Sequence, residues 1–525
     1  MRQPYYYFLN RNRNGDGFSE LKSSEIFVDK TGLIEEINRK ISTKEKWICV
    51  SKPRRFGKTT AVEMLAAYYT KGNHSEPLFQ GLNAMEGKTF YKHLNAHNVI
   101  YVNFSDYFGK GPVSREIEAF SSRMIKDLDH AFPGILEDTA DLALSLDMIC
   151  QATEEKFIFL IDEWDSIFRL RRGKEEEHEE FLEFLRTLFK DKSYLELVYM
   201  TGILPIKKYS TGSALNMFRE YTMLEPRRLA SYFGFTGSEV AKLCGKQNRL
   251  TLEELKEWYD GYDMGDKEAV YNPKSVAEAL TEGKCCDYWN KTGGYSELEE
   301  YITKDFDGLG EAVTRMLAGE AVEVNVFGFS NDLDSFQNKD EVITALIHLG
   351  YLTSEGGKVR IPNREIAEEF ANSVKKLSWG TVTELLRQSR ELLAATCNRE
   401  ADRVAALLES VHDDMHEFKE YNNEHTLKCV IHLAYYAAQD AYRLRFEENA
   451  GKGVADCLMY PKRRGIPGIV LELKYNRSAE EAVEQIRRKE YAREMTGAAD
   501  NVLLVGINYD KSSKRHQCVI EEIHL

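Results

Sequence analysis

The sequence predicts an α/β protein with a buried parallel sheet in its first half and a smaller α/β region near its C-terminus. Three stretches predict this organisation. Residues 47–50 are a short apolar run that leads through a basic loop into a run of good helix formers. Residues 157–161 are five apolar residues followed by two carboxylates, as in a buried strand. Residues 454–475 contain two apolar runs around a Pro- and Gly-containing turn, as in a β-hairpin.

The composition is that of an ordinary globular protein of several domains. The chain has 525 residues, of which 43% are hydrophobic and 30% charged, enough for roughly three or four domains. No apolar run reaches the ~18 residues of a membrane-spanning helix, so we expect no membrane partner. The N-terminus lacks the apolar segment of a secretory signal.

The cysteines indicate the redox compartment of the protein, and the net charge limits how it could bind nucleic acid. Nine cysteines are scattered without a C-x-x-C pair, which favours reduced thiols in a cytoplasm over a disulfide framework or a zinc site. The net charge of −15 excludes bulk electrostatic attraction to nucleic acid, so any such binding must use local basic patches.

The basic loop has the features of a phosphate-binding loop. Residues 51–60 read S-K-P-R-R-F-G-K-T-T between the predicted strand and the predicted helix. In such a loop, backbone N–H groups surround a polyanion, Lys58 reaches the β- and γ-phosphates, and the Thr59 hydroxyl binds Mg²⁺. Lys52 stands where the full motif has glycine, and the loop alone leaves open a chance G-K-T at a helix start. The residues expected to bind the nucleotide here are Arg55, Phe56, Gly57, Lys58, Thr59 and Thr60.

The two carboxylates after residues 157–161 complete a nucleotide-hydrolysis motif. We expect Asp162 to hold Mg²⁺ and Glu163 to polarise the attacking water, because a buried strand delivers both to the edge of the sheet where ligands bind. A strand that ends in a polar turn is the alternative, but G-K-T and this D-E pair occur together, about a hundred residues apart. Thr201, after the apolar run 195–200, could sense the γ-phosphate. ATP and Mg²⁺ are therefore the expected cofactors.

The middle of the chain predicts helices and a small β-wing. A helix begins near residue 236, capped by Thr236 or Ser238. Residues 340–349 form a helix closed by Gly350, followed by two short strands around a Gly-Gly turn, which is the order of a winged helix. Because His348 is the one potentially basic group on that helix, packing within the molecule is favoured over DNA binding.

The C-terminal region predicts a second metal site. A long helix from residue 423 to about residue 441 is followed by the hairpin that carries Asp456, Glu472 and Lys474, and a further helix is expected over residues 479–495. Glu472 and Lys474 project from the same face of a strand. Two carboxylates can hold a divalent cation while a neighbouring ammonium orients water at a phosphodiester. An exposed E-x-K alternation on an edge strand is the alternative, although the apolar run before Glu472 favours a buried acid.

The charge of the tail agrees with a nucleic-acid substrate. Residues 424–525 carry 16 Lys and Arg against 15 Asp and Glu, so the net negative charge lies in the rest of the chain. Basic clusters at residues 462–464 and 487–489 could contact phosphates weakly and without sequence preference.

Several motifs together resemble a known family. They are F-V-D-K-T-G-L-I, K-P-R-R-F-G-K-T-T, F-L-I-D-E-W-D, Y-M-T-G-I-L-P-I and W-Y-D-G-Y. Together they resemble the bacterial AAA-ATPase-like proteins that carry a C-terminal PD-(D/E)xK nuclease-like domain. The resemblance implies an AAA-like ATPase core at residues 1–235, a helical lid at 236–320, a winged-helix-like segment at 321–390 and a nuclease-like α/β domain at 391–525. Asp456, Glu472 and Lys474 match the nuclease motif, Glu424 matches the acid on the preceding helix, and Gln485 matches a glutamine that often follows.

Three functions are consistent with these patterns. The first is an ATP-hydrolysing, metal-dependent nuclease acting on nucleic acid, with DNA as the expected substrate, in defence or mobile-element biology. The second is an ATP-dependent switch whose tail binds nucleic acid or a protein without cleavage. The third is a scaffold with a structural nucleotide. In a homo-oligomeric ring, Arg219, Arg227 or Arg228 could reach a neighbour's nucleotide, but surface arginines are the simpler interpretation.

Overall fold

The computed structural model contains two compact units. The first consists of Met1–Gly293 and Glu323–Ile366, and the second of Gly294–Val322 and Ala367–Leu525. The chain passes between the units three times, after residues 293, 322 and 366, and these cuts fall inside the segments 236–320 and 321–390 that the sequence was expected to form as separate domains. The residues that the structure describes are 7–11, 13–136, 139–206, 215–247, 249–265, 268–289, 295–304, 306, 308–327, 329, 336–377, 380–413 and 424–525.

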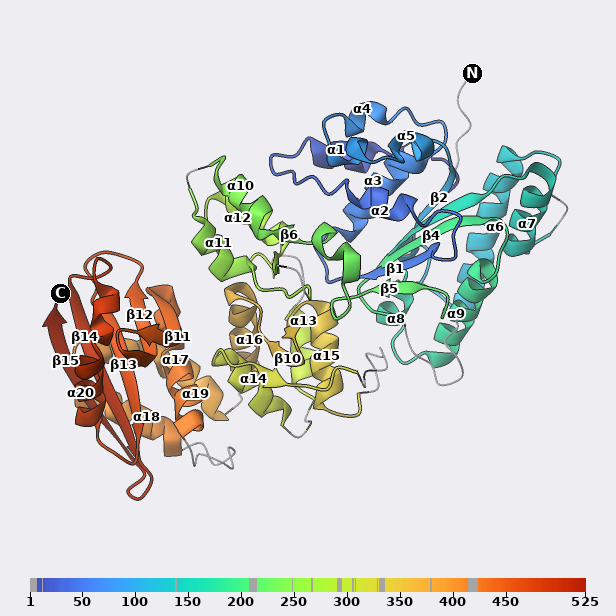
Figure 1. Cartoon of the computed structure of the whole chain (residues 1–525). Coiled ribbons are helices and arrows are strands. Elements are labelled where there is room, and N and C mark those ends of the chain that lie inside the picture. Colours follow the sequence, from blue (N-terminus) through green and yellow to red (C-terminus); the bar gives the residue numbers. More distant parts are fainter. Residues whose placement is uncertain are drawn as a thin grey trace. The chain divides into compact units, whose positions relative to one another are not determined.

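A five-stranded parallel sheet lies at the centre of the first unit, in the order β2-β3-β4-β1-β5 (Figure 1). Each pair of neighbouring strands in this sheet is parallel, and β4 lies between β1 and β3. This confirms the predicted α/β core with a parallel sheet. The strands are β1 (Trp47–Ser51), β2 (Asn98–Asn103), β3 (Phe157–Asp162), β4 (Leu195–Gly202) and β5 (Arg219–Tyr221).

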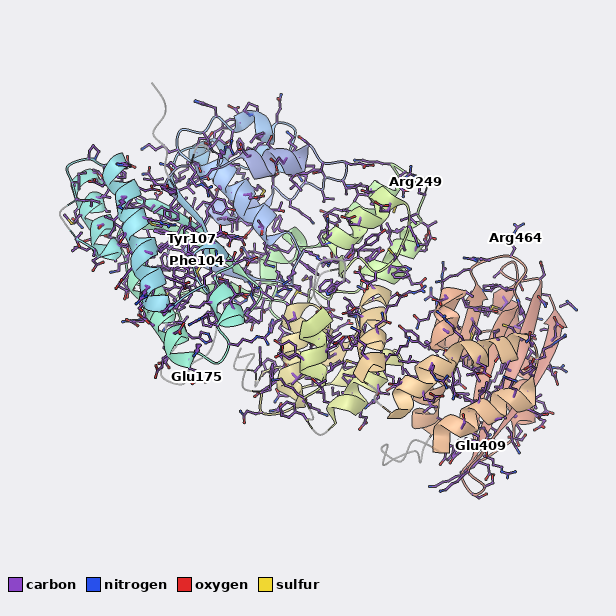
Figure 2. The ribbon with its side chains drawn as sticks, turned by 180° about the vertical axis from the view of Figure 1, so that it is seen from behind. Phe104, Tyr107, Glu175, Arg249, Glu409 and Arg464 are labelled. Atoms are coloured by element: carbon purple, nitrogen blue, oxygen red, sulfur yellow. The ribbon has the colours of Figure 1, made fainter. Side chains whose placement is uncertain are left out.

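Helices cover both faces of this sheet. One face packs with α6 (Val113–Ala131), α7 (Leu142–Thr153) and α9 (Glu175–Phe189) into a core that includes Phe104 and Phe120. Figure 2 shows Phe104 and its neighbour Tyr107 at this face. The other face packs with α2 (Leu33–Asn38) and α3 (Lys58–Tyr69). A sheet buried on both sides explains why its strands are apolar throughout rather than alternating.

A small helical group follows the sheet in the first unit. Its helices are α10 (Gly237–Cys244), α11 (Leu252–Tyr259) and α12 (Pro273–Glu282). Thr236, and not Ser238, caps α10: its hydroxyl accepts from the N–H of Glu239, and the Glu239 side chain bonds back to the N–H of Thr236. The helices share a core of buried residues around Leu255 and Tyr259.

The predicted helix and β-wing also belong to the first unit. They are α15 (Lys339–Leu349) and the antiparallel pair β9 (Thr353–Glu355) and β10 (Lys358–Arg360). Gly350 ends α15 with φ of 89°, a left-handed conformation that favours glycine. A Cβ built at Gly350 would lie 2.6 Å from the Cβ of Pro53. This segment therefore packs against the phosphate loop, which agrees with the interpretation that it serves packing.

The second unit combines helices with a mixed sheet in the order β11-β12-β13-β14-β15. The β12–β13 hairpin is antiparallel, as predicted, and β13 pairs with β14 in parallel. The strands are β11 (Tyr442–Ala450), β12 (Gly453–Pro461), β13 (Gly468–Tyr475), β14 (Asn501–Asp510) and β15 (Arg515–His524). The helices are α13 (Tyr295–Ile302), α14 (Leu309–Leu317), α16 (Arg364–Leu377), α17 (Gly380–Cys397), α18 (Ala401–Asp413), α19 (Glu424–Ala434) and α20 (Ala479–Lys489).

Two helices of the tail are shorter than the sequence predicts. The helix from residue 423 was expected to continue to about residue 441, but α19 ends at Ala434 and a 3-10 turn follows. The helix expected over residues 479–495 ends at Lys489, where Glu490 adopts φ of 59°. The carbonyl of Lys489 accepts from the N–H of Lys452 at 2.8 Å, so the β11–β12 turn replaces the next helical bond.

The remaining elements are short. They are α1 (Asp16–Lys22), α4 (Glu76–Phe79), α5 (Phe90–His93), α8 (Ser166–Leu170), β6 (Phe235–Thr236), β7 (Val270–Tyr271) and β8 (Val322–Glu323). Among the described helices, none has both the length and the apolar character needed to cross a bilayer.

Candidate functional site

The phosphate loop joins β1 to α3 in the first unit. Gly57 precedes α3 with φ of 86°, and open space surrounds the position of its missing Cβ. Lys58 folds back over the loop and donates to the carbonyl oxygen of Pro53 at 2.7 Å. Burial lowers the pKa of Lys58 to about 8, although the charge of Asp162 opposes this shift. A buried ammonium that bonds a neutral carbonyl would gain from an anionic partner, so this loop fits a phosphate.

Polar groups gather at the carboxyl ends of three adjacent strands. Asp162, at the end of β3, is fully buried. Its Oδ2 accepts from the hydroxyl of Thr59 at 2.6 Å, and its Oδ1 accepts a very short hydrogen bond from Thr201. The structure thus brings together three residues that the sequence singled out separately. A hydroxyl beside a carboxylate is an oxygen donor set that suits Mg²⁺.

Glu163 lies beside this cluster in a strained backbone conformation. Its φ is 51°, which is unusual for a residue other than glycine, and such strain is concentrated at functional sites. Its N–H donates to Asp162 at 3.1 Å, and its side chain stays 40% exposed. The Glu163 side chain, next to Asp162, is therefore accessible to solvent, as a water-polarising residue requires.

Sequence reasoning missed two residues of this network, Asp165 and Arg169. Arg169, in α8, donates to Glu163 Oε2 at 3.1 Å, and its Nε lies 3.4 Å from Asp165 Oδ2. Asp165 is fully buried and accepts the N–H groups of Ile203 and Leu204 at 3.0 and 2.9 Å. The i,i+4 spacing of Asp165 and Arg169 after D-E-W was a signal that could have found them.

The basic side chains at the start of the loop point away from this cluster. Lys52 is fully buried, and its Nζ donates to the carbonyl of Thr222 at 2.8 Å. Burial lowers the pKa of Lys52 to about 7. Arg55 donates to the carbonyl of Tyr288 at 3.0 Å and lies 5.6 Å from the ring centroid of Trp289.

Phe56 and Thr60 complete the loop residues singled out from the sequence. Phe56 is fully buried and packs edge-on against Tyr262, with ring centroids 5.0 Å apart. Thr60 lies in the first turn of α3. At Arg55 and Phe56 the side chains are engaged elsewhere, so a phosphate contact at these positions would use backbone N–H groups.

The three candidate arginines pair with surface acids or lie exposed. Arg219, in β5, lies 3.4 Å from Glu45. Arg227 forms a very short pair with Glu225. Arg228 is exposed, and its charge contributes to lowering the pKa of Glu45. Nothing in this arrangement distinguishes one of them as a residue that reaches a neighbouring nucleotide.

In the second unit, Asp456 and Glu472 face each other at the end of the β12–β13 pairing. The pairing runs from Met459 and Ile469 to Cys457 and Leu471, and the two acids come next on their strands. Asp456 Oδ2 then accepts the N–H of Leu473 at 2.8 Å, so at this position β13 bonds to the side chain of Asp456 and not to a backbone carbonyl of β12. Both residues are buried.

Lys474 and Gln485 both contact the same oxygen of Glu472. Lys474 Nζ lies 3.0 Å from Glu472 Oε1, and Gln485 forms a very short hydrogen bond to the same atom. Glu472 Oε2 is buried and has no hydrogen-bond partner among the described residues. Burial and the nearby charge of Asp456 raise the pKa of Glu472 to about 7. An unpartnered buried carboxylate oxygen beside a second carboxylate fits a hard divalent cation.

Lys428 is a residue of this site that sequence reasoning missed. It lies on α19, and its Nζ is 3.0 Å from Asp456 Oδ1 and 3.3 Å from Glu447 Oε1. Burial alone would lower the pKa of Lys428, but the bonds to Asp456 and Glu447 raise it. Glu424 begins the same helix, and its side chain lies outside the described residues. Within the described part of the chain, no group of three or more His, Cys, Asp or Glu is placed to hold a metal ion.

Two family models match separate parts of this chain. Residues 16–211 match the family described as predicted AAA-ATPase, and residues 422–518 match the PD-(D/E)XK nuclease superfamily. These matches confirm the resemblance stated from the motifs. They cover the phosphate loop and Asp162 in one case, and Lys428, Asp456 and Glu472 in the other. No curated protein matches this chain.

Solved structures with some similarity to this chain include two nucleotide-related proteins at 12–13% identity. The Walker-type ATPase PABY2304 of Pyrococcus abyssi is 13% identical, with 65% of this chain and 94% of that chain covered and a TM-score of 0.34. The Aeropyrum pernix ORC2 protein is 12% identical, with 71% and 99% covered and a TM-score of 0.30. The two family matches, and not these distant similarities, support an ATPase-like and a nuclease-like domain in this chain.

Proposed function

Because this chain combines a predicted AAA-ATPase domain with a PD-(D/E)XK nuclease-superfamily domain, we propose that it hydrolyses ATP with Mg²⁺ and cleaves phosphodiester bonds of nucleic acid. DNA is the first candidate substrate. The observation that supports hydrolysis most directly is the meeting of Thr59, Asp162 and Thr201 beside Lys58. The observation that supports cleavage is the buried pair of Asp456 and Glu472 with Lys474 bonded to the second acid.

In the first unit, the chain's own residues would bind and orient the nucleotide. Lys58 would exchange the Pro53 carbonyl for a phosphate oxygen, and N–H groups at the start of α3 would bind the same polyanion. Mg²⁺, when bound, would offset phosphate charge beside Thr59 and Asp162. Glu163 would accept a proton from the attacking water, and Arg169 would hold its carboxylate.

In the second unit, Asp456 and Glu472 would hold a divalent cation that activates water and neutralises the phosphodiester. Gln485 and Lys474 fix the Glu472 carboxylate, which leaves its Oε2 for the cation. Exposed basic residues stand on the β12–β13 loop, where Figure 2 shows Arg464 pointing away from the sheet. Such residues would give salt-sensitive contacts to the nucleic-acid backbone.

A binding-only tail is the second candidate function. It is favoured by the ion pair of Lys428 with Asp456, because this pair satisfies part of the carboxylate without a cation. In that case ATP would change the conformation of the protein, and the tail would bind nucleic acid or a protein without cutting.

The cellular setting follows from weaker observations and is part of the proposal. All nine cysteines are unbridged, which agrees with a reducing compartment such as the cytoplasm. Homo-oligomerisation and a role against foreign DNA or in mobile elements would accompany an ATP-driven nuclease.

Lys58→Ala tests the first activity. We expect Mg²⁺-dependent ATP hydrolysis to fall about 100-fold, because a charged group that contacts the transferred phosphoryl is lost. Lys71→Ala is the matched control, since Lys71 forms a half-exposed pair with Glu155. Equal hydrolysis by wild type and Lys58→Ala would refute the nucleotide site.

Asp456→Asn tests the second activity and separates it from the binding-only alternative. We expect Mn²⁺- or Mg²⁺-dependent cleavage of single- or double-stranded DNA or RNA to be lost in the variant, measured with and without ATP. Asp500→Asn, at an exposed position, is the control. If wild type binds nucleic acid without any cleavage, the binding-only function is correct.

A further inference from the structure

Lys428 reaches the cation-binding side of Asp456 from a different element. Asp456 lies on β12, whereas Lys428 lies on α19. The Lys428 side chain is 20% exposed and that of Asp456 is 12% exposed. The ion pair is therefore shielded, unlike the pair of Lys452 and Glu490, in which the lysine is 65% exposed. A shielded ammonium beside a candidate metal ligand repels any cation that binds to that ligand.

The oxygens of the two acids are not equivalent. Asp456 Oδ2 accepts the Leu473 N–H, and Glu472 Oε1 accepts from Lys474 and Gln485. Asp456 Oδ1 and Glu472 Oε2 are the other two oxygens. Glu472 Oε2 has no partner among the described residues, and Asp456 Oδ1 pairs with Lys428. A cation bridging the two acids through these oxygens would thus meet Lys428 at one of its two ligands.

We propose that Lys428 occupies the cation's place on Asp456 and, when a divalent cation displaces it, binds the phosphodiester of the nucleic acid. This inference rests on the proposed nuclease function. A divalent cation on Asp456 would repel the Lys428 ammonium, whereas a phosphate would attract it. The four-carbon lysine side chain is long and flexible enough to move between the two. Lys428 is in this sense a second lysine of the site, separate from Lys474, which stays on Glu472.

A purely structural ion pair would behave differently. If Lys428 only supported the fold, its removal would weaken cation binding and nucleic-acid binding together, because Asp456 would lose its position. If Lys428 competes with the cation, its removal has opposite effects on the two ligands. Cation affinity rises, and affinity for nucleic acid falls.

The test uses the full chain and four variants, Lys428→Met, Lys428→Arg, Asp456→Asn and the surface control Lys452→Met. Mn²⁺ binding is titrated by electron paramagnetic resonance without nucleotide or nucleic acid. Binding of a labelled DNA duplex is then measured by anisotropy in Mn²⁺ at several salt concentrations, on a time scale short of cleavage or with a non-cleavable phosphate analogue.

We expect Lys428→Met to bind Mn²⁺ roughly tenfold more tightly than wild type, because one positive charge leaves the site. The slope of log K against log salt for DNA should fall by about one, as expected when one phosphate contact is lost. Lys428→Arg keeps the charge and should retain both wild-type values to within a few-fold. Lys452→Met should match wild type in Mn²⁺ affinity.

Unchanged or weaker Mn²⁺ binding by a folded Lys428→Met, or an unchanged salt slope, would overturn the proposal while the nuclease function stands. If wild type and Asp456→Asn titrate alike, no cation binds at Asp456. That result would refute the proposed nuclease function itself, and with it the role of Lys428.

Discussion

Arg169 connects two carboxylates that follow β3, those of Glu163 and Asp165. It contacts Glu163 on its exposed side and Asp165 on its buried side. Asp165 in turn holds the N–H groups of Ile203 and Leu204, immediately after the end of β4. Through Arg169 and Asp165, the position of Glu163 is therefore tied to the end of the strand that carries Thr201.

Replacing Arg169 should impair turnover more than binding. We expect Arg169→Gln to lower kcat for ATP about tenfold or more, since a misplaced general base loses part of its typical contribution. The KM should change little, because the predicted phosphate contacts come from Lys58 and the start of α3. Steady-state kinetics measure both values.

The matched control is Arg186→Gln, which breaks an exposed pair with Glu183. In a Glu163→Gln background, Arg169→Gln should add almost no further loss, because both changes remove the same function. A full additional loss in that background would show that Arg169 acts independently of Glu163.

At the scale of elements, α15 and the glycine that ends it pack against the phosphate loop. Gly350 combines a left-handed φ of 89° with close approach to Pro53 of the phosphate loop. The loop is also held by contacts of Arg55 with Tyr288 and of Phe56 with Tyr262. The helices and wing thus pack on the loop that is expected to bind the nucleotide.

Gly350→Ala should destabilise the protein and weaken nucleotide binding. The added methyl would lie 2.6 Å from the Pro53 side chain, in addition to the cost of the left-handed backbone. We expect the free energy of unfolding to fall by about 2–3 kcal/mol. Chemical denaturation and a titration with a fluorescent ATP analogue measure the two effects.

Gly72→Ala isolates the backbone cost alone. Gly72 has nearly the same φ, 87°, but nothing lies within 4 Å of the added methyl. We expect a smaller loss, about 1 kcal/mol, and unchanged nucleotide affinity. Equal effects of the two changes would show that the contact with Pro53 is unimportant.

At the scale of the whole molecule, one of the three cuts between the two units, the one after Ile366, falls inside α16. Its second residue, Glu365, is fully buried. Glu365 accepts the N–H groups of Tyr288 and Trp289 at 2.8 and 3.0 Å and the hydroxyl of Ser275 at 2.8 Å. Tyr288 is also the residue whose carbonyl Arg55 contacts. The start of α16 is thus joined through one short segment to the phosphate loop.

Glu365 should make stability depend on pH. Burial, together with the nearby charge of Asp287, raises the pKa of Glu365 to about 7 from an ordinary 4.5, although its hydrogen bonds oppose this. The folded state therefore holds the proton more tightly than the unfolded state. This contribution is fully present below about pH 4.5 and is lost as the pH rises through about 7.

Glu365→Gln should remove that dependence. Relative to the variant, wild type should lose about 3 kcal/mol of unfolding free energy between pH 4.5 and pH 7.5. Urea denaturation across this range measures the difference, with Glu253→Gln, at an exposed position, as the control. If the unfolding free energies of wild type and Glu365→Gln change equally with pH, the pKa of Glu365 is not raised in the folded protein.

A substitution that abolishes the function of one unit should leave the function of the other unit intact. Each unit has its own buried core. We expect Lys58→Ala to abolish ATP hydrolysis and to leave Mn²⁺ affinity at Asp456 within about twofold of wild type, since the two sites share no partner residues. Asp456→Asn should do the reverse. Titration of each variant for both functions tests this, and a large change in Mn²⁺ affinity on Lys58→Ala would show coupling without nucleotide.

The sequence by itself determined the parts that depend on local order. The strand, loop and helix around Lys58, the apolar strand before Asp162 and the hairpin that carries Asp456 and Glu472 follow from short patterns of apolar, glycine and acidic residues. Periodicity and turn chemistry act within about ten residues, so they can be interpreted without a fold.

Only the tertiary structure decided which distant groups meet. Lys428 lies on α19, and the sequence gives no sign that its charge reaches Asp456 on β12. Arg169 follows Asp165 at helical spacing, but its bond to Glu163 is set by the position of α8 at the end of β3. The directions of Lys52 and Arg55, away from the expected phosphates, and the early end of α20 at Lys489 are likewise set by contacts across the fold. The physical reason is that side-chain direction and helix length depend on neighbours brought together by packing, and sequence spacing does not encode those neighbours.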